Sequence, residues 1–555
     1  MRDAGEVSEE PRRVWLWALL VAAALSALYL LGSVGYPLAE PDEARYGEVA
    51  REMLVRQDWV TPHLNFQPYF HKPPLLFWLS AASFSQFGVS EFAGRLPVVL
   101  TGLLTLAMTG LLARRMYGAG EAVVAVAIAG FAPLFAFLAV ILSPNMPLAC
   151  FLTLALGAVW LAADSPGRAW WRVAYVSVAL AVLAKGPVAL VLVAVPAGLF
   201  LFARGGLRAC WSAVDAVGIA LASLVVLPWF VLVSWRNPGF LHFFIVEQHV
   251  ARYLWNKEHT LAWWQFLALL PVGMLPWTLL PLLDLGAARA SADPRSWAAA
   301  SRYLALWVAV VLGFFALSSS KLGTYVLPAI PPAAILLARV VCLTLRAGRD
   351  AFLARIAPAL MIAGLVASLC GALLPFFIHH WRMPLVAPYL WAGGLALAGS
   401  GWLVRRAVAA ARPWAAFAAF ASGCAALVSV AVAGRGLANE SRTLALAARP
   451  LAASGARLAT YQAELHGLNF YTGQPYAVVS DQASVSPYGG PADPALRWQG
   501  NDALRRAWAG PDRVVLAIGP RALEHLAPPL DPAPIIVVRT PKTLLVTNRP
   551  LPLAP

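Results

Sequence analysis

The chain contains 555 residues, of which 60% are hydrophobic and only 12% are charged, and its formal net charge is +15. Soluble domains carry about 25% charged residues, so this composition excludes an ordinary soluble protein and indicates a polytopic α-helical membrane protein. The positive charge does not require a nucleic-acid partner, because the cytoplasmic loops of membrane proteins are rich in Lys and Arg.

The apolar runs predict about thirteen membrane-spanning helices. The first run is too long for a cleavable signal peptide, so we expect a spanning helix that is retained. Several later runs are shorter than the usual ~20 residues, which implies tilted helices or local thinning of the bilayer. The predicted spans lie near residues 14–36, 96–113, 121–142, 146–164, 173–184, 187–203, 213–235, 262–283, 303–317, 326–342, 356–378, 385–404 and 413–434.

A short apolar run at 73–88 determines the predicted orientation. If this run lies flat in the membrane interface, the later arginine clusters fall on the same side as Arg12 and Arg13, as the positive-inside rule requires. The N-terminus is then cytoplasmic, and the loop 37–72 and the C-terminal tail are on the outer side of the membrane.

The composition changes after the last predicted span. Apolar runs of strand length, such as "YAVVS" and "RVVLAIG", alternate with helix-like pieces such as "DALRRAWAG". This alternation predicts a small α/β domain. We therefore divide the chain into a transmembrane catalytic domain, 1–434, whose first outer loop with interfacial helices covers 37–95, and an outer α/β domain, 435–555.

The predicted topology gathers the unusual polar residues on the outer side. Three of the chain's few lysines, Lys72, Lys185 and Lys321, lie at membrane boundaries beside Pro or Gly. Elsewhere the chain uses Arg as its general cation, so these positions indicate a need for a compact ammonium group. The short polar stretches "SPN" at 143–145 and "EQHVARY" at 247–253 fall on the same side.

The stretch "EPDEARYGEVAREM", 40–53, places a dense group of charges directly after the first span. Asp42 could be a helix N-cap, since a helical pattern follows it, or half of a buried pair with an arginine. An ionisable cluster at the rim of a helical bundle also predicts a functional site. In that third interpretation, cations bind the phosphate of a lipid carrier, and the carboxylate acts as a base or orients a substrate.

These residues resemble a known family. The pattern in Pro41–Tyr46, Arg51–Met53, Asp58–Pro62 and Tyr69–Pro73 is similar to the first outer loop of bacterial lipid A aminoarabinose transferases. That family is related to the protein O-mannosyltransferases and shares their membrane-embedded, lipid-phosphate-dependent glycosyltransferase fold. "LAKGP" and "KLGTYVLP" also look like family motifs, so the resemblance covers essentially the whole chain.

The resemblance implies an undecaprenyl phosphate-linked sugar as donor, lipid A as acceptor, and an active site at the periplasmic face of the bacterial inner membrane. It implies that Asp42 is the catalytic carboxylate. It also implies that the donor phosphate contacts Lys72 and Tyr325, with help from Arg45, Lys185 and Arg252. Further candidates for substrate contacts are Glu43, Tyr46, Tyr69, Asn145 and Lys321.

Two positions depart from the family pattern. His71 and Asn145 stand where the aminoarabinose branch usually has acids, which weakens the prediction that the sugar is 4-amino-4-deoxy-L-arabinose. A His71/His249 pair could instead bind a divalent metal such as zinc, for which imidazole is a good ligand.

Other functions fit parts of the pattern. A protein mannosyltransferase, or a transferase of another sugar to an envelope glycan, would use the same donor class. A flippase or secondary transporter would place its ionisable residues at mid-membrane on broken helices, whereas here they cluster at helix ends. Because each motif has a partner within the chain, we expect a monomer in contact with membrane lipids.

Overall fold

The computed structural model describes residues 6–255, 261–280, 299–347, 351–377, 383–434, 440–481, 488 and 493–550. The chain divides into two compact units. We call them the membrane unit, residues 1–34, 98–228 and 249–437, and the loop–tail unit, residues 35–97, 229–248 and 438–555. The loop–tail unit thus joins the first loop to the C-terminal residues, which are about 400 positions later in the sequence.

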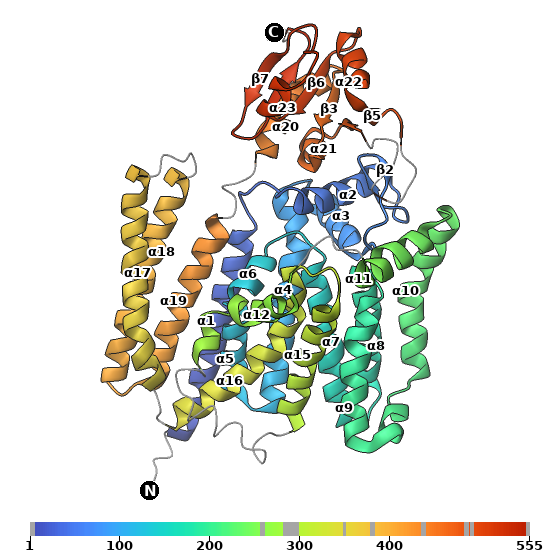
Figure 1. Cartoon of the computed structure of the whole chain (residues 1–555). Coiled ribbons are helices and arrows are strands. Elements are labelled where there is room, and N and C mark those ends of the chain that lie inside the picture. Colours follow the sequence, from blue (N-terminus) through green and yellow to red (C-terminus); the bar gives the residue numbers. More distant parts are fainter. Residues whose placement is uncertain are drawn as a thin grey trace. The chain divides into compact units, whose positions relative to one another are not determined.

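Long apolar helices make up most of the membrane unit (Figure 1). In the described residues, nine helices are long and apolar enough to cross a membrane. The helices that lie wholly or partly in this unit are α1 (Glu6–Gly32), α4 (Glu91–Met116), α5 (Ala119–Gly130), α6 (Pro133–Leu138), α7 (Asn145–Ala163), α8 (Ala169–Lys185), α9 (Val188–Ser212), α10 (Ala216–Arg236), η1 (His242–Ala251), α11 (Arg252–Leu254), α12 (Trp263–Gly273), η2 (Trp277–Leu279), α15 (Ala299–Leu317), η3 (Gly323–Ala329), α16 (Ile330–Arg346), α17 (Ala351–Phe377), α18 (Met383–Ala409) and α19 (Pro413–Gly434).

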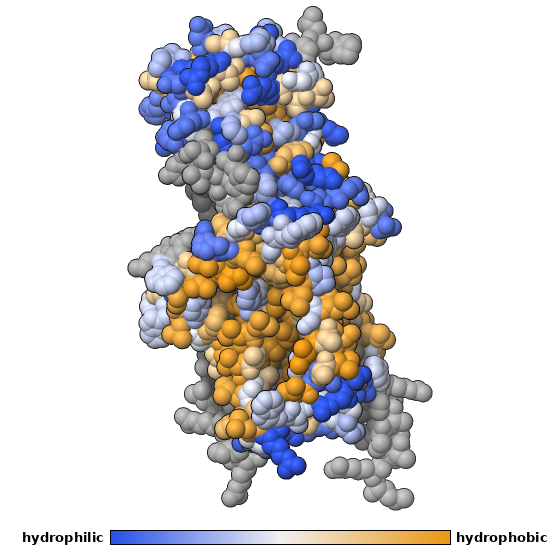
Figure 2. Space-filling view, turned by 90° about the vertical axis from the view of Figure 1, so that its right-hand side faces the viewer, coloured by the Kyte–Doolittle hydropathy of each residue, from blue (hydrophilic) through white to orange (hydrophobic). Residues whose placement is uncertain are grey.

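The outer faces of these helices carry large apolar side chains, as expected for contact with lipid. Leu104, Leu224 and Leu365 are exposed, and a broad hydrophobic surface is visible in the space-filling view (Figure 2). An exposed apolar surface of this kind marks a membrane-facing region. The prediction of a multi-pass α-helical membrane protein is therefore confirmed, while the total of thirteen spans stays a prediction.

Proline and glycine set the ends of several of these helices. The predicted span 121–142 is broken, because α5 ends at Gly130 and α6 begins at Pro133, which has no N–H for a continuing helix. Gly186 has a φ of 96° and separates α8 from α9 within the "LAKGP" motif. Because this left-handed conformation suits glycine, it ends α8 directly after Lys185.

The first loop contributes two helices and a small hairpin to the loop–tail unit. These elements are α2 (Asp42–Arg56), β1 (His63–Leu64), β2 (Gln67–Pro68) and α3 (Leu75–Phe87). At 13 residues, α3 is about 20 Å long, too short to cross a hydrocarbon core of ~30 Å. Its length agrees with the expected interfacial helix at 73–88, whose position in the membrane stays a prediction.

The C-terminal residues form the predicted α/β domain. A six-stranded sheet has the order β5-β4-β3-β6-β8-β7. The strands β5, β4, β3 and β6 are parallel to one another, and β8 pairs antiparallel with both β6 and β7. The elements are α20 (Ser441–Ala453), β3 (Arg457–Tyr461), α21 (His466–Thr472), β4 (Tyr476–Ser480), β5 (Arg497–Gln499), α22 (Gly500–Ala509), β6 (Val514–Ile518), α23 (Pro520–Glu524), β7 (Ile535–Arg539) and β8 (Leu544–Thr547).

Side chains that alternate along the strands form two apolar layers, one on each face of the sheet. Leu458 packs with Leu444 of α20 and Leu468 of α21, whereas the next residue, Ala459, packs with Trp508 of α22 on the opposite face. Successive side chains of a strand point to opposite faces, so one short strand serves both layers. This packing fixes α20 and α21 on the same face of the sheet.

Asn65 joins the first loop to Tyr476, the first residue of β4. Its side chain donates to the carbonyl of Tyr476 at 2.8 Å and accepts the Tyr476 N–H at 3.0 Å. It also accepts a hydrogen bond from Asn469 of α21 at 2.8 Å, and it is 1% exposed. One buried amide therefore satisfies backbone groups that would otherwise be stranded away from water.

We expect Asn65→Ala to lower the free energy of unfolding by about 2–4 kcal/mol, because it leaves the N–H and C=O of Tyr476 buried without partners. Thermal unfolding of the purified protein in detergent measures this loss. Gln57→Ala is the matched control, since Gln57 shares the left-handed backbone (φ 56° against 51° for Asn65) but is exposed. Equal losses in the two variants would contradict the role given to Asn65.

Candidate active site

The predicted site residues lie in two groups, one in each unit. The loop–tail unit carries Asp42, Glu43, Arg45, Tyr46, Tyr69, His71 and Lys72, which we call the Asp42 group. The membrane unit carries Asn145, Lys185, His249, Arg252, Lys321 and Tyr325, which we call the Lys185 group.

Asp42 is the first residue of α2, and its carboxylate is open to solvent. Pro41 occupies the N-cap position, and no side chain caps this helix. The interpretation of Asp42 as an N-cap is therefore wrong, and so is a fully buried pair, because its side chain is 64% exposed. Its partner is Arg45, one helical turn later, at 3.5 Å. An exposed carboxylate beside one guanidinium can still receive a substrate.

Aromatic rings surround the rest of the Asp42 group. Tyr69 interacts electrostatically with Arg45. Its ring packs on that of His71, with the centroids 5.0 Å apart. His71 stacks on Phe243, with centroids 5.6 Å apart and planes 23° apart. Tyr46 is buried against Phe77, and the ammonium of Lys72 donates to the carbonyl of His71 at 3.0 Å. The aromatic packing fixes the backbone that carries His71 and Lys72.

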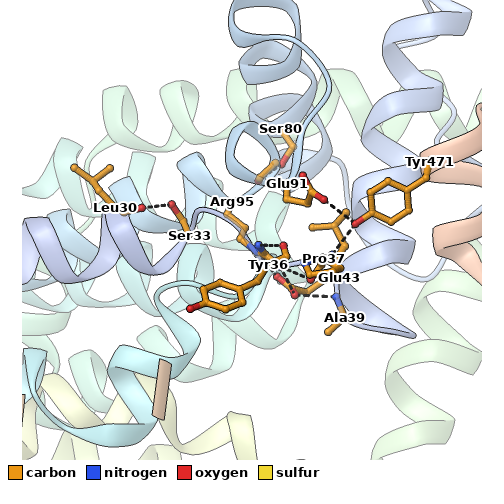
Figure 3. Close-up of polar contacts among 12 residues, drawn as sticks. Leu30, Ser33, Tyr36, Pro37, Ala39, Glu43, Ser80, Glu91, Arg95 and Tyr471 are labelled. Atoms are coloured by element: carbon orange, nitrogen blue, oxygen red, sulfur yellow. Dashed lines mark hydrogen bonds and ion pairs between the residues drawn. The ribbon is translucent and has the colours of Figure 1, made fainter. Parts of the chain in front are cut away.

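Glu43 forms a buried charge pair that the sequence did not predict. Arg95 donates from Nε to Oε1 and from Nη2 to Oε2 of Glu43, both at 2.8 Å (Figure 3). Both side chains are essentially inaccessible to solvent. The same guanidinium donates to the carbonyls of Tyr36 and Pro37 at 2.7 and 2.9 Å. Glu43 therefore holds the chain in place directly before Asp42.

The Lys185 group has an ammonium at its centre. Lys185 donates to Oδ1 of Asn145 at 2.6 Å, and its Nζ lies 4.2 Å from the centroid of the Tyr325 ring. A neutral amide and an aromatic face orient the ammonium. Nε2 of His249 lies 3.2 Å from the Lys185 carbonyl. An ammonium is a compact charge of the kind that binds phosphate.

The remaining candidates of the membrane unit lie near the ends of helices. Arg252 begins α11, whereas Lys321 is half-buried between α15 and η3. In the part of the chain that the structure describes, no group of three or more His, Cys, Asp or Glu side chains could hold a metal ion. Zinc sites use three or four protein ligands, so the described residues do not supply such a set, and the His71/His249 hypothesis stays a prediction.

Comparisons with known proteins place this architecture in a class. The family model of the dolichyl-phosphate-mannose-protein mannosyltransferases matches residues 71–235. The crystal structure of ArnT from Cupriavidus metallidurans bound to undecaprenyl phosphate superposes with a TM-score of 0.78 and 26% identity, over 96% of this chain and 98% of that one. The fold is thus that of the membrane-embedded glycosyltransferases that use lipid-phosphate donors.

Sequence relatives define the family more narrowly. The undecaprenyl phosphate-α-4-amino-4-deoxy-L-arabinose arabinosyl transferase 1 of Pseudomonas fluorescens strain Pf-5 is 30% identical over 454 residues, covering 75% of this chain and 76% of that protein. The chain belongs to this arabinosyl transferase family. The corresponding protein of strain Pf0-1 is 33% identical over 356 residues, covering 60% of this chain and 59% of the relative. The alignments with these first relatives thus reach from about three fifths to three quarters of their length.

Two titratable side chains of the loop–tail unit have shifted pKa values, and sequence analysis did not single them out. They are the half-buried Glu40 and the buried His466. Burial raises the pKa of Glu40 to about 7, although N–H groups of Gly467 and His466 and the hydroxyl of Ser441 act in the opposite direction. Burial, followed by the charges of Arg45 and Arg497, lowers the pKa of His466 to about 3. The interior therefore disfavours the charged form of both side chains.

The two pKa shifts predict opposite effects of pH on stability. Below pH ~6.5, His466 is protonated in the unfolded chain but stays neutral in the folded protein, and this difference destabilises the wild type. His466→Gln should therefore gain stability relative to wild type as pH falls. Above pH ~4.5 unfolded Glu40 loses a proton that the folded form keeps, so Glu40→Gln should gain stability as pH rises towards 7. Each trend should approach about 1.4 kcal/mol per pH unit.

Unfolding of the two variants and of wild type, measured at pH 5, 6 and 7, checks these trends. The comparison with wild type cancels the contributions of all other titrating groups. A variant whose stability relative to wild type does not follow its expected trend would contradict the pKa shift assigned to the residue it replaces.

Proposed function

We propose that this chain transfers 4-amino-4-deoxy-L-arabinose from undecaprenyl phosphate to a phosphate of lipid A at the periplasmic face of the bacterial inner membrane. Membership of the arabinosyl transferase family supports the reaction class. The observation that carries the proposal is the exposed carboxylate of Asp42, which directly precedes the buried Glu43–Arg95 pair. The oriented ammonium of Lys185 supports a phosphate-bearing donor.

In the proposed reaction, an oxygen of the lipid A phosphate attacks the anomeric carbon of the sugar. The bond between that carbon and the donor phosphate oxygen breaks, and undecaprenyl phosphate leaves with the electron pair. Cations neutralise the charge that develops on the leaving phosphate, and Lys185, oriented beside Tyr325, is the one proposed for this role in the membrane unit.

Asp42 acts on the sugar in this scheme. The lipid A phosphate is already anionic, so no base is needed to activate it. The carboxylate instead stabilises the positive charge that builds on the ring at the anomeric carbon, and it orients the amino sugar. We expect a single displacement, because the neighbouring carboxylate of Glu43 is buried and bound by Arg95 and so does not serve as the nucleophile of a covalent intermediate.

Mass spectrometry of lipid A from cells with and without this protein tests the proposed function. We expect one added aminoarabinose residue on a lipid A phosphate only when the protein is present. An unchanged lipid A together with a newly mannosylated protein would favour the second candidate, a protein mannosyltransferase, which the match at residues 71–235 supports.

Asp42→Asn should lower kcat at least 100-fold while leaving folding and membrane insertion intact, because it removes one exposed charge and no buried contact. Turnover of undecaprenyl phosphate-aminoarabinose with lipid A by purified protein provides the measurement. Asp502→Asn is the matched control, since Asp502 is also exposed and also pairs with an arginine one helical turn away. Wild-type turnover in Asp42→Asn would refute the role given to the carboxylate.

Lys185→Ala should mainly raise the KM for the lipid-linked donor, by about 10–100-fold, because a charge-assisted hydrogen bond to phosphate contributes about 1.5–3 kcal/mol. The same assay at varied donor concentration measures this change. Lys542→Ala, which truncates an exposed lysine of the α/β domain, serves as the control. A donor KM equal to that of wild type would remove Lys185 from the phosphate site.

A further inference from the structure

The segment that leads into Asp42 is held by a polar contact at nearly every residue. Arg95 binds the carbonyls of Tyr36 and Pro37, and the N–H of Ala39 donates to Glu43 Oε2 at 3.0 Å. These contacts come from α4 and α2. The contacts of the two other residues, Leu38 and Glu40, come from α21 of the C-terminal domain.

Tyr471 of α21 anchors Leu38. The N–H of Leu38 donates to the Tyr471 hydroxyl at 2.9 Å, and that hydroxyl donates to Oε1 of Glu91 at 3.0 Å (Figure 3). Glu91 in turn lies 3.6 Å from Arg442 of α20. A single hydroxyl therefore connects the segment before Asp42 to the first turn of α4 and to the α/β domain.

Gly467 of α21 anchors Glu40. Its N–H donates to Oε1 of Glu40 at 2.6 Å. A Cβ at position 467 would lie 2.6 Å from the Ser441 hydroxyl and 2.9 Å from Glu40 Oε1, so a larger residue would push the Ser441 and Glu40 side chains out of place. Glycine at this position therefore allows α21 to approach Glu40 closely.

The rest of α21 also faces the first loop. Asn469 donates to Asn65, and Phe470 packs on Phe84 of α3, with ring centroids 6.1 Å apart. Four residues of this seven-residue helix thus contact the loop, at 467, 469, 470 and 471.

We propose that α21 of the C-terminal domain is a positioning element for Asp42, in which Tyr471 and Gly467 fix the backbone at Leu38 and Glu40 and thereby set the place of the carboxylate two residues further on. The inference rests on the proposed function, in which Asp42 acts on the sugar. Misplacement of a reacting group by about 1 Å can cost about 100-fold in rate, so small backbone shifts should be visible in turnover.

Tyr471→Phe removes one hydroxyl and keeps the ring. We expect its kcat to fall about 10-fold while the KM for undecaprenyl phosphate-aminoarabinose stays within about 2-fold of wild type, because Asp42 moves while Lys185 keeps its contacts with Asn145 and Tyr325. Tyr461→Phe is the matched control: it also loses a phenol hydrogen bond, to Asn501 at 2.9 Å, but lies on a strand of the same domain. We expect its kinetics to equal those of wild type.

Variants at Glu40 and Gly467 test the second anchor. Gly467→Ala and Glu40→Ala should lower kcat in the same way, whereas Glu40→Gln should restore most of the activity, because its amide oxygen still accepts the Gly467 N–H. Thermal unfolding identifies any variant that fails to fold, and the kinetic comparison then uses the folded ones. Tyr471→Phe and Gly467→Ala proteins that fold and turn over like wild type would overturn the proposal.

Different results separate the proposed function from the positioning role of α21. A wild-type protein with no transferase activity would contradict the proposed function. A fully active wild-type protein whose α21 variants are equally active would contradict only the positioning role. A loss confined to donor KM would assign α21 to donor binding, and would likewise contradict the proposal.

Discussion

The buried pair between Glu43 and Arg95 is the interaction on which the candidate active site depends. Removing two charges from water is costly, and a buried pair is stable only if its geometry is good and its remaining donors and acceptors are satisfied. Here the guanidinium binds both carboxylate oxygens and the carbonyls of Tyr36 and Pro37, and Glu43 also accepts the Ala39 N–H. The pair therefore fixes the backbone on the N-terminal side of Asp42, and it leaves Asp42 itself exposed.

The two groups of candidate residues differ in how their charges are treated. Glu43 is bound by the guanidinium of Arg95 and stabilises the loop, whereas Lys185 is oriented by the amide of Asn145 and the ring of Tyr325. The proposed function gives the buried charge pair a structural role and the oriented ammonium a role in phosphate binding.

Much of the fold could be predicted because it follows from local patterns. Each of the thirteen apolar runs corresponds to a described helix or pair of helices, and the strand-length runs "YAVVS" and "RVVLAIG" of the tail contain β4 and β6. The break in the helix before Pro133 and the strand β5 were not predicted, because a window of apolar residues does not detect a single proline or a three-residue strand. The functional role of the motif at 40–73 stays a prediction.

The contacts that hold this cluster could not be predicted from the sequence. Arg95 lies directly before the apolar run 96–113, and nothing in the surrounding sequence distinguishes it from other arginines at membrane boundaries. Tyr471 and Gly467 lie in a short helix of the tail, and their partners are more than 400 residues away. Tertiary packing alone brings such residues together, so periodicity and spacing carry no trace of them.

A double-mutant cycle of Glu43→Gln and Arg95→Met, with kcat per folded molecule as the readout, tests most directly whether this pair holds Asp42 in place. The account predicts strong non-additivity: each single variant and the double variant lose turnover to a similar extent, because the carbonyls of Tyr36 and Pro37 lose their donors or their fixed position. The double variant buries no unpaired charge, so it should fold even if a single variant does not. Wild-type turnover in the folded double variant would contradict the central claim.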